Sequence, residues 1–392
     1  MGFWNGRVTF TRYRLSGECP LPFGDEILEP VRNRLIGVHG LAGPADGVAT
    51  GWAGGDHVLD LNLEPGKNIV DDALHLAIRI DADKVPGALL RAYTQMEIDA
   101  RAQLNPSGFA TKAERQEAKE AAKLRIEAEA ADGRFRRLNH YPILWDGRTN
   151  TLYAGSTSTS VLDHIQSLFR ETFDRLLEPI TAGSLARSLA SDPSQPGLSI
   201  ANLERGPLSP AGVTSSPASS SAWDSDDPAS LDFLGNEFLV WIWHTLQNDG
   251  ESVRVADGSD VTVMLAKTLT LDCPRGETGR DQLTDDAPTR LPEALRALQS
   301  GKLPRKAGMI LVRQGAQYEL TLQAETLQVS SASLPKTEGG RLSSLETRIA
   351  RLKSLRHLAQ TLDLLFAAYL SKRTSSAWTD ELGRIRRWLQ AA

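Results

Sequence analysis

The most informative segment of this 392-residue chain is Gly133-Arg134-Phe135-Arg136-Arg137-Leu138-Asn139, followed by Tyr141-Pro142-Ile143-Leu144-Trp145-Asp146-Gly147. A basic cluster around one phenylalanine comes first, and an apolar run that ends at an Asp-Gly pair comes next. Short apolar runs favour buried strands, and Asp-Gly is a strong signal for a tight turn. We therefore predict a β-hairpin that turns at Asp146-Gly147 and returns through Tyr153.

Strand and helix patterns also precede this segment. Alternation of apolar and polar residues predicts strands over residues 7–13 and 72–81, and Pro86 opens a helical run. Thr111 with Glu114 three residues later is a capping box, so a second helix is expected to begin there. That helix is polar nearly all round, which is typical of a helix exposed to solvent or lying on a charged partner.

The same mixture follows the segment. Helical spacing predicts a helix from about Ser160 to Pro179, an apolar helix over residues 231–246 and a helical tail from Arg341. The expected strands are residues 252–255, 261–265, 267–271, 309–313, 318–322 and 326–329. Strands 309–313 and 318–322 are expected to form a hairpin that turns at Gln314-Gly315. These patterns indicate an α+β protein of mixed helices and antiparallel sheets with a C-terminal helical extension.

The length of the chain exceeds that of one ordinary hydrophobic core and suggests two or three domains. Residues 191–230 are rich in serine and proline and cannot bury enough apolar surface to become ordered. The expected division is an N-terminal α+β domain over 1–190, a linker over 191–230, a second α+β domain over 231–340 and a helical hairpin over 341–392.

The charge is distributed unevenly. From Arg341 onward there are ten Arg or Lys and four Asp or Glu, a net charge of +6. Since the whole chain has a net charge of −5, the preceding residues carry −11. This asymmetry permits a local anionic partner. The two cysteines, Cys19 and Cys273, lie far apart outside any CxxC motif, and no segment is apolar enough to span a membrane. We expect a cytoplasmic protein without membrane contact.

The sequence offers no recognisable catalytic motif. Its seven histidines are scattered, and neither a P-loop nor a GxSxG motif occurs. Glu117-Ala118-Lys119 has a spacing found in nucleases, but it lies in a helix full of Glu and Lys, where side-chain ion pairs are the better explanation. We therefore expect no catalytic residue, no metal site and no cofactor, and a protein that is not an enzyme.

Two basic clusters are candidate phosphate-binding sites. Arg134, Arg136 and Arg137 form the first, and three guanidinium groups in four positions suit phosphate oxygens. An equally weighted alternative is that they pair with the Glu-rich helix before them. Phe135 could stack on a base, pack in a core or lie in a dimer interface. The second cluster, which we expect in a loop, consists of Lys302, Arg305 and Lys306.

The order of these features over residues 1–185 resembles the RdgC family of recombination-associated proteins. The resemblance rests on Tyr13-Arg14-Leu15-Ser16, Gly51-Trp52, the charged helix from Lys112, the pattern Arg134 to Asn139 and the Leu-Trp-Asp hairpin. It implies a horseshoe-shaped subunit, and two subunits joined into a ring around double-stranded DNA. It also places Phe135 near a subunit contact and Lys302, Arg305 and Lys306 on a protruding basic loop. The family is associated with restraint of the RecA recombinase.

The leading prediction is therefore a nucleoid-associated homodimer that binds double-stranded DNA without sequence preference. The alternative is an interaction subunit of a multi-protein system, such as anti-phage defence, whose C-terminal helices dock a protein partner. The tail carries a regular apolar stripe from Leu342 to Tyr369, and such a stripe must be buried. We expect it to pack on its own domain.

Overall fold

The computed structural model describes residues 2–37, 48–193, 198–201, 203–206, 208, 230–274, 279–335 and 343–390. Most of the predicted linker, the apolar tail residue Leu342 and the tail's starting point at Arg341 lie outside these residues. The chain has the predicted α+β class, with antiparallel pairing between the strands and helices at its C-terminal end.

The chain divides into two compact units. Unit 1 comprises residues 1–23, 69–75 and 142–392, and unit 2 comprises residues 24–68 and 76–141. The boundaries predicted after residues 190, 230 and 340 all fall inside unit 1. Segments on both sides of those boundaries share one hydrophobic core, which includes Phe10, Phe238 and Leu362.

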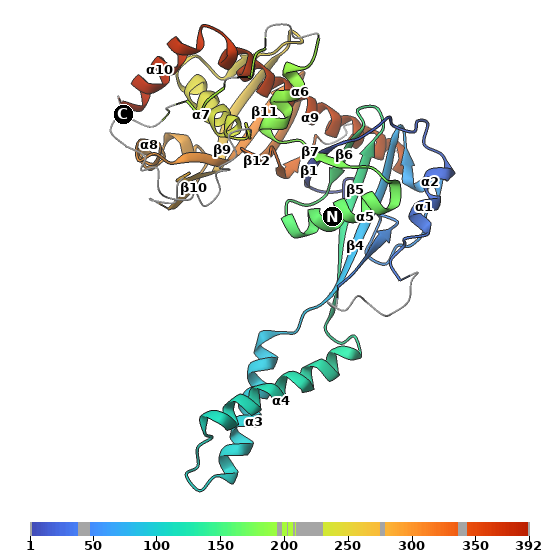
Figure 1. Ribbon diagram of the computed structural model, residues 1–392. Helices are drawn as coiled ribbons and strands as arrows, with labels where there is room; N and C mark the ends of the chain where they lie inside the picture. Colours follow the sequence, from blue (N-terminus) through green and yellow to red (C-terminus); the bar gives the residue numbers. More distant parts are fainter. Residues whose placement is uncertain are drawn as a thin grey trace. The chain divides into compact units, whose positions relative to one another are not determined.

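Unit 1 holds most of the strands and the long C-terminal helices (Figure 1). Its strands are β1 Val8–Leu15, β3 Ile69–Val70, β6 Thr151–Ala154, β7 Leu177–Pro179, β8 Ser252–Arg254, β9 Asp260–Asp272, β10 Arg280–Asp285, β11 Leu303–Arg313, β12 Ala316–Gln323 and β13 Val329–Ser333. Its helices are α5 Thr159–Phe173, α6 Ala182–Ala190, α7 Phe233–Asn248, the 3-10 turn η2 Pro288–Arg290, α8 Pro292–Gln299, α9 Ser344–Thr374 and α10 Trp378–Gln390.

Unit 2 is smaller and mainly helical. It contains the 3-10 turn η1 Asp25–Ile27, α1 Glu29–Arg32, β2 Val48–Ala53, α2 Pro65–Asn68, α3 Gly87–Leu104 and α4 Lys112–Ala131. Two strands, β4 Ala73–Asp83 and β5 Arg136–Asp146, each have residues in both units.

The strands of unit 1 follow the order β10-β9-β11-β12-β13-β1-β6-β5, with β7 on β1 and β8 on β9. The predicted hairpin is confirmed, since Asp146 of β5 pairs with Thr151 of β6. A second predicted hairpin, formed by β11 and β12, turns at Gln314 and Gly315, both of which have positive φ. Helix α7 contacts β9 and β11 (Figure 1). It is buried on nearly all sides, as its continuous apolar sequence predicts.

The C-terminal tail packs on its own unit, as predicted. The apolar stripe of α9 is buried in the same core as the strands; its buried members are Leu352, Leu355, Leu358, Leu362, Leu365 and Tyr369. This part of the stripe is therefore covered by the chain itself, whereas Leu345 near the start of α9 is 50% exposed. The alternative, a protein partner docked on the C-terminal helices, stays a hypothesis.

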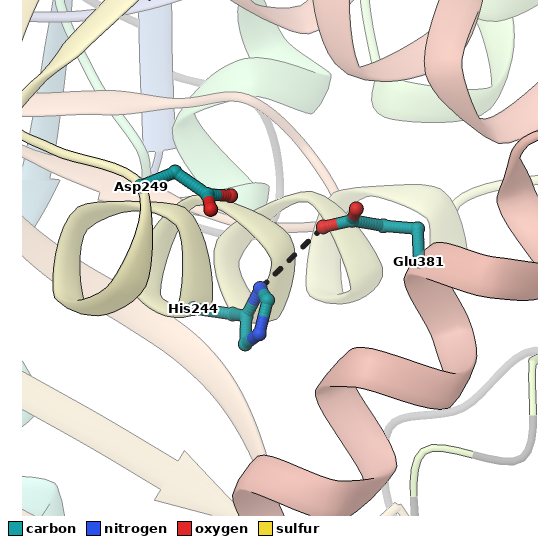
Figure 2. A group of neighbouring side chains, drawn as sticks. All are labelled: His244, Asp249 and Glu381. Carbon is teal, nitrogen blue, oxygen red and sulfur yellow. Dashed lines mark ion pairs between the residues drawn. The ribbon is translucent and has the colours of Figure 1, made fainter.

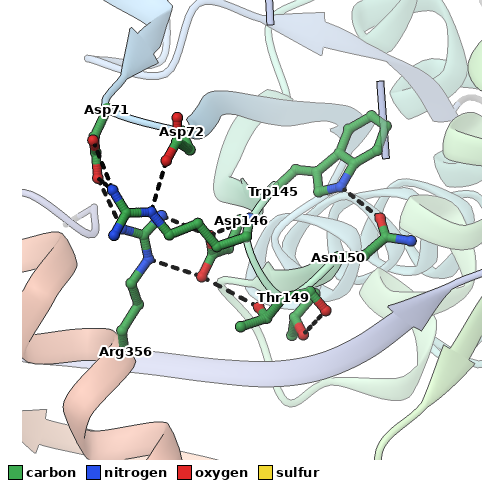
Figure 3. A network of polar contacts seen from close by, with 9 residues as sticks. Asp71, Asp72, Trp145, Asp146, Thr149, Asn150 and Arg356 are labelled. Atoms are coloured by element: carbon green, nitrogen blue, oxygen red, sulfur yellow. Dashed lines mark hydrogen bonds and ion pairs between the residues drawn. The ribbon is translucent and has the colours of Figure 1, made fainter. Parts of the chain in front are cut away.

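Buried ion pairs attach α9 to the strands. Arg356 of α9 donates two hydrogen bonds to the fully buried Asp146, over 2.9 and 2.6 Å, and a third to Asp71 over 2.9 Å (Figure 3). Arg12 of β1 makes a bidentate pair with Asp363, at 2.9 and 2.8 Å. Bidentate geometry fixes the orientation of a guanidinium as well as its position, so these pairs set the register of α9 against β1 and β5.

Three elements differ from the sequence-based expectation. Helix α5 ends at Phe173 and not near Pro179, because Asp174 adopts a left-handed conformation that stops the helix. Strand β9 is continuous where two strands were expected, with an irregularity at Lys267, whose φ is 67°. Strand β13 begins at Val329, after Leu327 with its positive φ.

In unit 2, α3 and α4 form an antiparallel helical hairpin (Figure 1). The predicted capping box is confirmed, since the Thr111 hydroxyl accepts from the Glu114 backbone N–H and Glu114 accepts from the Thr111 backbone N–H. The hydroxyl of Tyr93 donates to Glu129 over 2.8 Å, and the Arg125 guanidinium lies 4.1 Å from the Tyr93 ring centroid. Polar contacts therefore supply part of what holds this hairpin together.

In the described part of the chain, no helix combines the length and the apolar character that crossing a membrane requires.

Candidate functional site

Strands β9, β11 and β12 present two chemically different faces. Successive side chains of a strand point to opposite faces of a sheet. Leu269, Met309 and Leu320 represent the face that is buried in the core against α7. The opposite face is at least partly exposed, and its polar members include Thr268, Thr270, Lys306, Thr321 and Gln323.

The polar side chains form a row across four strands. Gln282 of β10 lies opposite Thr270 of β9, which lies opposite Lys306 of β11, which in turn lies opposite Gln323 of β12. Residues in register on adjacent strands have neighbouring side chains. This row of amide, hydroxyl and ammonium groups is therefore continuous across the sheet.

A shallow cavity of about 300 Å³ lies over this row, and we name it the sheet-face pocket. It is lined by Thr268, Thr270, Arg280, Gln282, Arg305, Lys306, Thr321 and Gln323. None of these lining residues is acidic, and three are cationic. The pocket is therefore rich in hydrogen-bond donors and carries positive charge.

The three cations of the sheet-face pocket differ in how they are held. Arg305 pairs with Glu325 at 3.2 Å and lies 3.7 Å from Asp272, so its position is fixed from behind. Arg280 also pairs with Asp272, at 3.1 Å. Lys306 is exposed, and we find no ion pair for its ammonium group within the described part of the chain. Lys306 is thus the cation most available to an anionic ligand.

A second recess of about 130 Å³ adjoins the pocket, and Thr321 lines both. Here Glu319 accepts hydrogen bonds from Lys267 at 2.7 Å and from Arg7 at 2.9 Å. These two hydrogen bonds lower the pKa of the Glu319 carboxyl, so it is ionised at neutral pH. In this recess both cations share a carboxylate that lines the recess itself, whereas no carboxylate lines the sheet-face pocket.

The structure separates the residues predicted as the second basic cluster. Arg305 and Lys306 both line the sheet-face pocket. Lys302, by contrast, is buried, and its ammonium group lies 2.6 Å from Asp281. The expectation that Lys302 is available to DNA is therefore corrected. The expected loop is also corrected, because β11 already begins at Leu303.

The first basic cluster lies in unit 2, at the end of α4 and the start of β5. Arg134 pairs with Glu129 of α4 at 3.3 Å, which is the alternative the sequence left open, and Arg136 lies 3.8 Å from Asp83. Arg137 is exposed. The ring of Phe135 is partly buried, and its carbonyl accepts a hydrogen bond from the Lys84 N–H over 3.0 Å. Arg137 is therefore the one exposed arginine of this cluster for which the described residues show no ion pair.

Sequence reasoning missed several lining residues of the pocket. Arg280 and Gln282 lie on β10, whose sequence Arg-Asp-Gln-Leu-Thr-Asp lacks the apolar alternation that marks a strand. Gln323 and Thr321, by contrast, lie on β12, where polar residues alternate with Tyr318, Leu320 and Leu322. That alternation was a usable signal that the outward face of β12 is polar.

The chemistry of the sheet-face pocket suits binding to an oxyanion. Guanidinium and ammonium groups form charge-assisted hydrogen bonds with phosphate oxygens, and threonine hydroxyls and glutamine amides add neutral donors. The lining residues include neither a histidine nor a cysteine nor a carboxylate.

No protein-family model matches the chain, and no curated protein matches it significantly.

Proposed function

We propose that this chain is a non-enzymatic protein of RdgC type that binds double-stranded DNA without sequence preference. It would act as a cytoplasmic, nucleoid-associated homodimer in recombination or genome maintenance. The observation that supports DNA binding best is the sheet-face pocket, where Arg280, Arg305 and Lys306 lie among polar side chains and no acidic residue lines the cavity.

The composition of the pocket favours contacts to the DNA backbone. Threonine and glutamine can donate to phosphate and sugar oxygens, and the three cations can replace condensed counterions. Reading of base edges requires side chains that project into a groove, usually from a helix or a two-stranded ribbon. Short side chains on the face of a sheet reach the backbone more readily than the bases. The proposal therefore concerns sequence-independent binding.

The test is a titration of the full chain with fluorescently labelled duplexes of unrelated sequence at several salt concentrations. We expect the affinity to fall linearly with salt on a double-logarithmic plot, with a slope of roughly −0.9 for each phosphate neutralised. We also expect similar affinities for all duplexes. A slope near zero, or a strong preference for one sequence, would contradict the proposal.

A second candidate function is that of an interaction subunit, and the α3–α4 hairpin favours it. Leu104 and Phe109, on either side of the turn, are 84% and 72% exposed. The turn is nevertheless ordered by hydrogen bonds, since the Asn105 amide donates to the Phe109 carbonyl and to Glu114. Exposed apolar side chains on a preorganised turn are typical of a protein contact surface.

The double variant L104S/F109S tests whether the hairpin mediates self-association, with L59S as a control because Leu59 is also exposed. If the hairpin joins copies of this chain, L104S/F109S lowers the sedimentation coefficient of the full chain and L59S does not, while DNA affinity and the melting temperature stay unchanged in both. If wild type and L104S/F109S sediment identically, self-association through this turn is excluded.

A further inference from the structure

A group of potential metal ligands lies in unit 1, where the end of α7 meets α10. His244 and Asp249 come from α7 and its C-cap, and Glu381 comes from α10 (Figure 2). The ligand atoms of the three side chains all lie within 4.8 Å of one another. Imidazole nitrogen and carboxylate oxygen are both among the ligand atoms that zinc accepts.

His244 has a buried ring nitrogen without a hydrogen bond. The residue is only 2% exposed, and its Nδ1 neither donates nor accepts a hydrogen bond among the described residues. Nδ1 points toward Glu381, with 3.4 Å between Nδ1 and Oε1 (Figure 2). A buried polar atom without a hydrogen bond is costly. A metal ion between the imidazole and the carboxylate would satisfy both groups.

The distance between these two atoms suits zinc. Zinc binds histidine nitrogen and carboxylate oxygen at about 2.0–2.2 Å in tetrahedral geometry, so neighbouring ligand atoms lie about 3.3 Å apart. The 3.4 Å between Nδ1 of His244 and Oε1 of Glu381 corresponds to such an edge. Asp249 is the mobile member, because its side chain is 40% exposed and can rotate toward the other two.

Packing holds the ring of His244 in place. The imidazole lies against Trp388 in an edge-to-face arrangement, with 5.5 Å between the centroids.

Arg384 balances the negative charge of the two carboxylates. Its guanidinium pairs with Glu381 at 3.1 Å and with Asp249. Lys372 lies 3.6 Å from the same carboxylate oxygen of Glu381. Asp249 needs such a cation, because a carboxylate at the C-terminal end of a helix is unfavourable beside the partial negative charge there. Arg384 is partly exposed and is free to swing toward solvent.

We propose that His244, Asp249 and Glu381 form a zinc-binding site that joins α10 to the end of α7, with a water molecule as fourth ligand. Zinc and Arg384 compete for the two carboxylates. The site contributes to the attachment of α10 and is independent of the sheet-face pocket, so its test does not depend on DNA binding.

The test is an isothermal titration of the full chain with zinc chloride after dialysis against a chelator. Cobalt chloride in a parallel titration reports tetrahedral coordination through strong visible absorption. We expect one zinc ion per wild-type chain and no such binding in H244Q. D249N should bind at least about tenfold more weakly, because even the loss of a residue that only supports a ligand costs about 10–100-fold. H164Q is the control for histidine removal and should bind as wild type does.

R384M sharpens the test, because removal of the competing cation should tighten zinc binding. If zinc binds to R384M but not to wild type, the ligand set is still supported, and Arg384 is then a dominant competitor of zinc. D249N keeps the test decisive if H244Q fails to fold, since the side chain of Asp249 is partly exposed. Zinc that binds equally to wild type, H244Q and D249N overturns the proposal. So does the absence of stoichiometric zinc in both wild type and R384M.

Discussion

The C-terminal tail and the sheet-face pocket both carry cations, but they use them differently. The arginines of α9 are directed into the protein: Arg356 pairs with Asp146, Arg373 with Glu237 at 2.8 Å, and Arg351 donates to the carbonyls of Phe3 and Gly6. On the pocket, Lys306 is exposed and has no ion pair in the residues that the structure describes.

This difference shows that local net charge alone does not identify a binding surface. The tail carries a net +6 in sequence, yet several of its guanidinium groups are already satisfied by buried carboxylates or carbonyls. A cation that must leave a buried partner to reach a ligand exposes that partner as an uncompensated charge. The sheet face has fewer cations, but one of them, Lys306, is exposed and has no buried partner to leave among the described residues.

The largest expected effect on stability comes from a variant that breaks a contact of the tail. R356M leaves the fully buried Asp146 without its bidentate partner, and removal of one member of a buried pair costs about 3–5 kcal/mol. We expect the lower end of that range, because the Arg148 N–H and the Thr149 hydroxyl still donate to Asp146. Urea unfolding, followed by tryptophan fluorescence, measures the change in the free energy of unfolding.

The control for R356M is R387M, because Arg387 is an exposed arginine of α10. Substitution of an exposed residue changes the free energy of unfolding by about 0.5 kcal/mol or less. If R356M is as stable as R387M, the tail arginines are not structural and the contrast between the two regions fails.

A smaller effect concerns the pH dependence of stability, which we expect from Asp257, the partner of a second buried arginine. Arg313 of β11 pairs with Asp257 and donates to Thr361 of α9. Hydrogen bonds from Ser259, and then from Arg313, lower the pKa of Asp257 to about 2. Because the folded-state pKa lies below the unfolded value of about 3.9, Asp257 stabilises the fold above pH 4 and loses this contribution as the pH falls toward 2.

The variant D257N tests this dependence. We expect the difference in melting temperature between wild type and D257N to be constant above about pH 5 and to shrink progressively below pH 4. D285N, at the exposed end of β10, is the control and should show no such trend. A difference that grows toward low pH would show that the carboxylate of Asp257 is not stabilised by its partners.

The sequence predicted local structure well where residues close together in the chain determine it. The capping box at Thr111, the hairpin around Asp146-Gly147 and the turn at Gln314-Gly315 depend only on nearby residues, and all three are confirmed. The buried stripe of α9 was predictable for the same reason, because helical periodicity reports burial directly. The early end of α5 was not predictable from apolar spacing, since it depends on the conformation of Asp174.

The candidate sites were less predictable, because they depend on pairing between distant segments. Nothing local distinguishes Lys302, which is buried beside Asp281, from Lys306, which is exposed four residues later. The pocket likewise requires β10 to lie beside β9, and β10 has no apolar alternation. His244 and Glu381 are separated by more than a hundred residues, so no motif scan with short ligand spacing could join them.

The most direct test compares the salt dependence of duplex DNA binding in K306Q and K353Q. Both lysines are exposed, but Lys306 lines the sheet-face pocket and Lys353 lies on α9 of the tail. If the pocket binds phosphate, K306Q lowers the magnitude of the salt slope by about 0.9 and K353Q leaves it unchanged. A reduced slope in K353Q with an unchanged slope in K306Q would contradict the account.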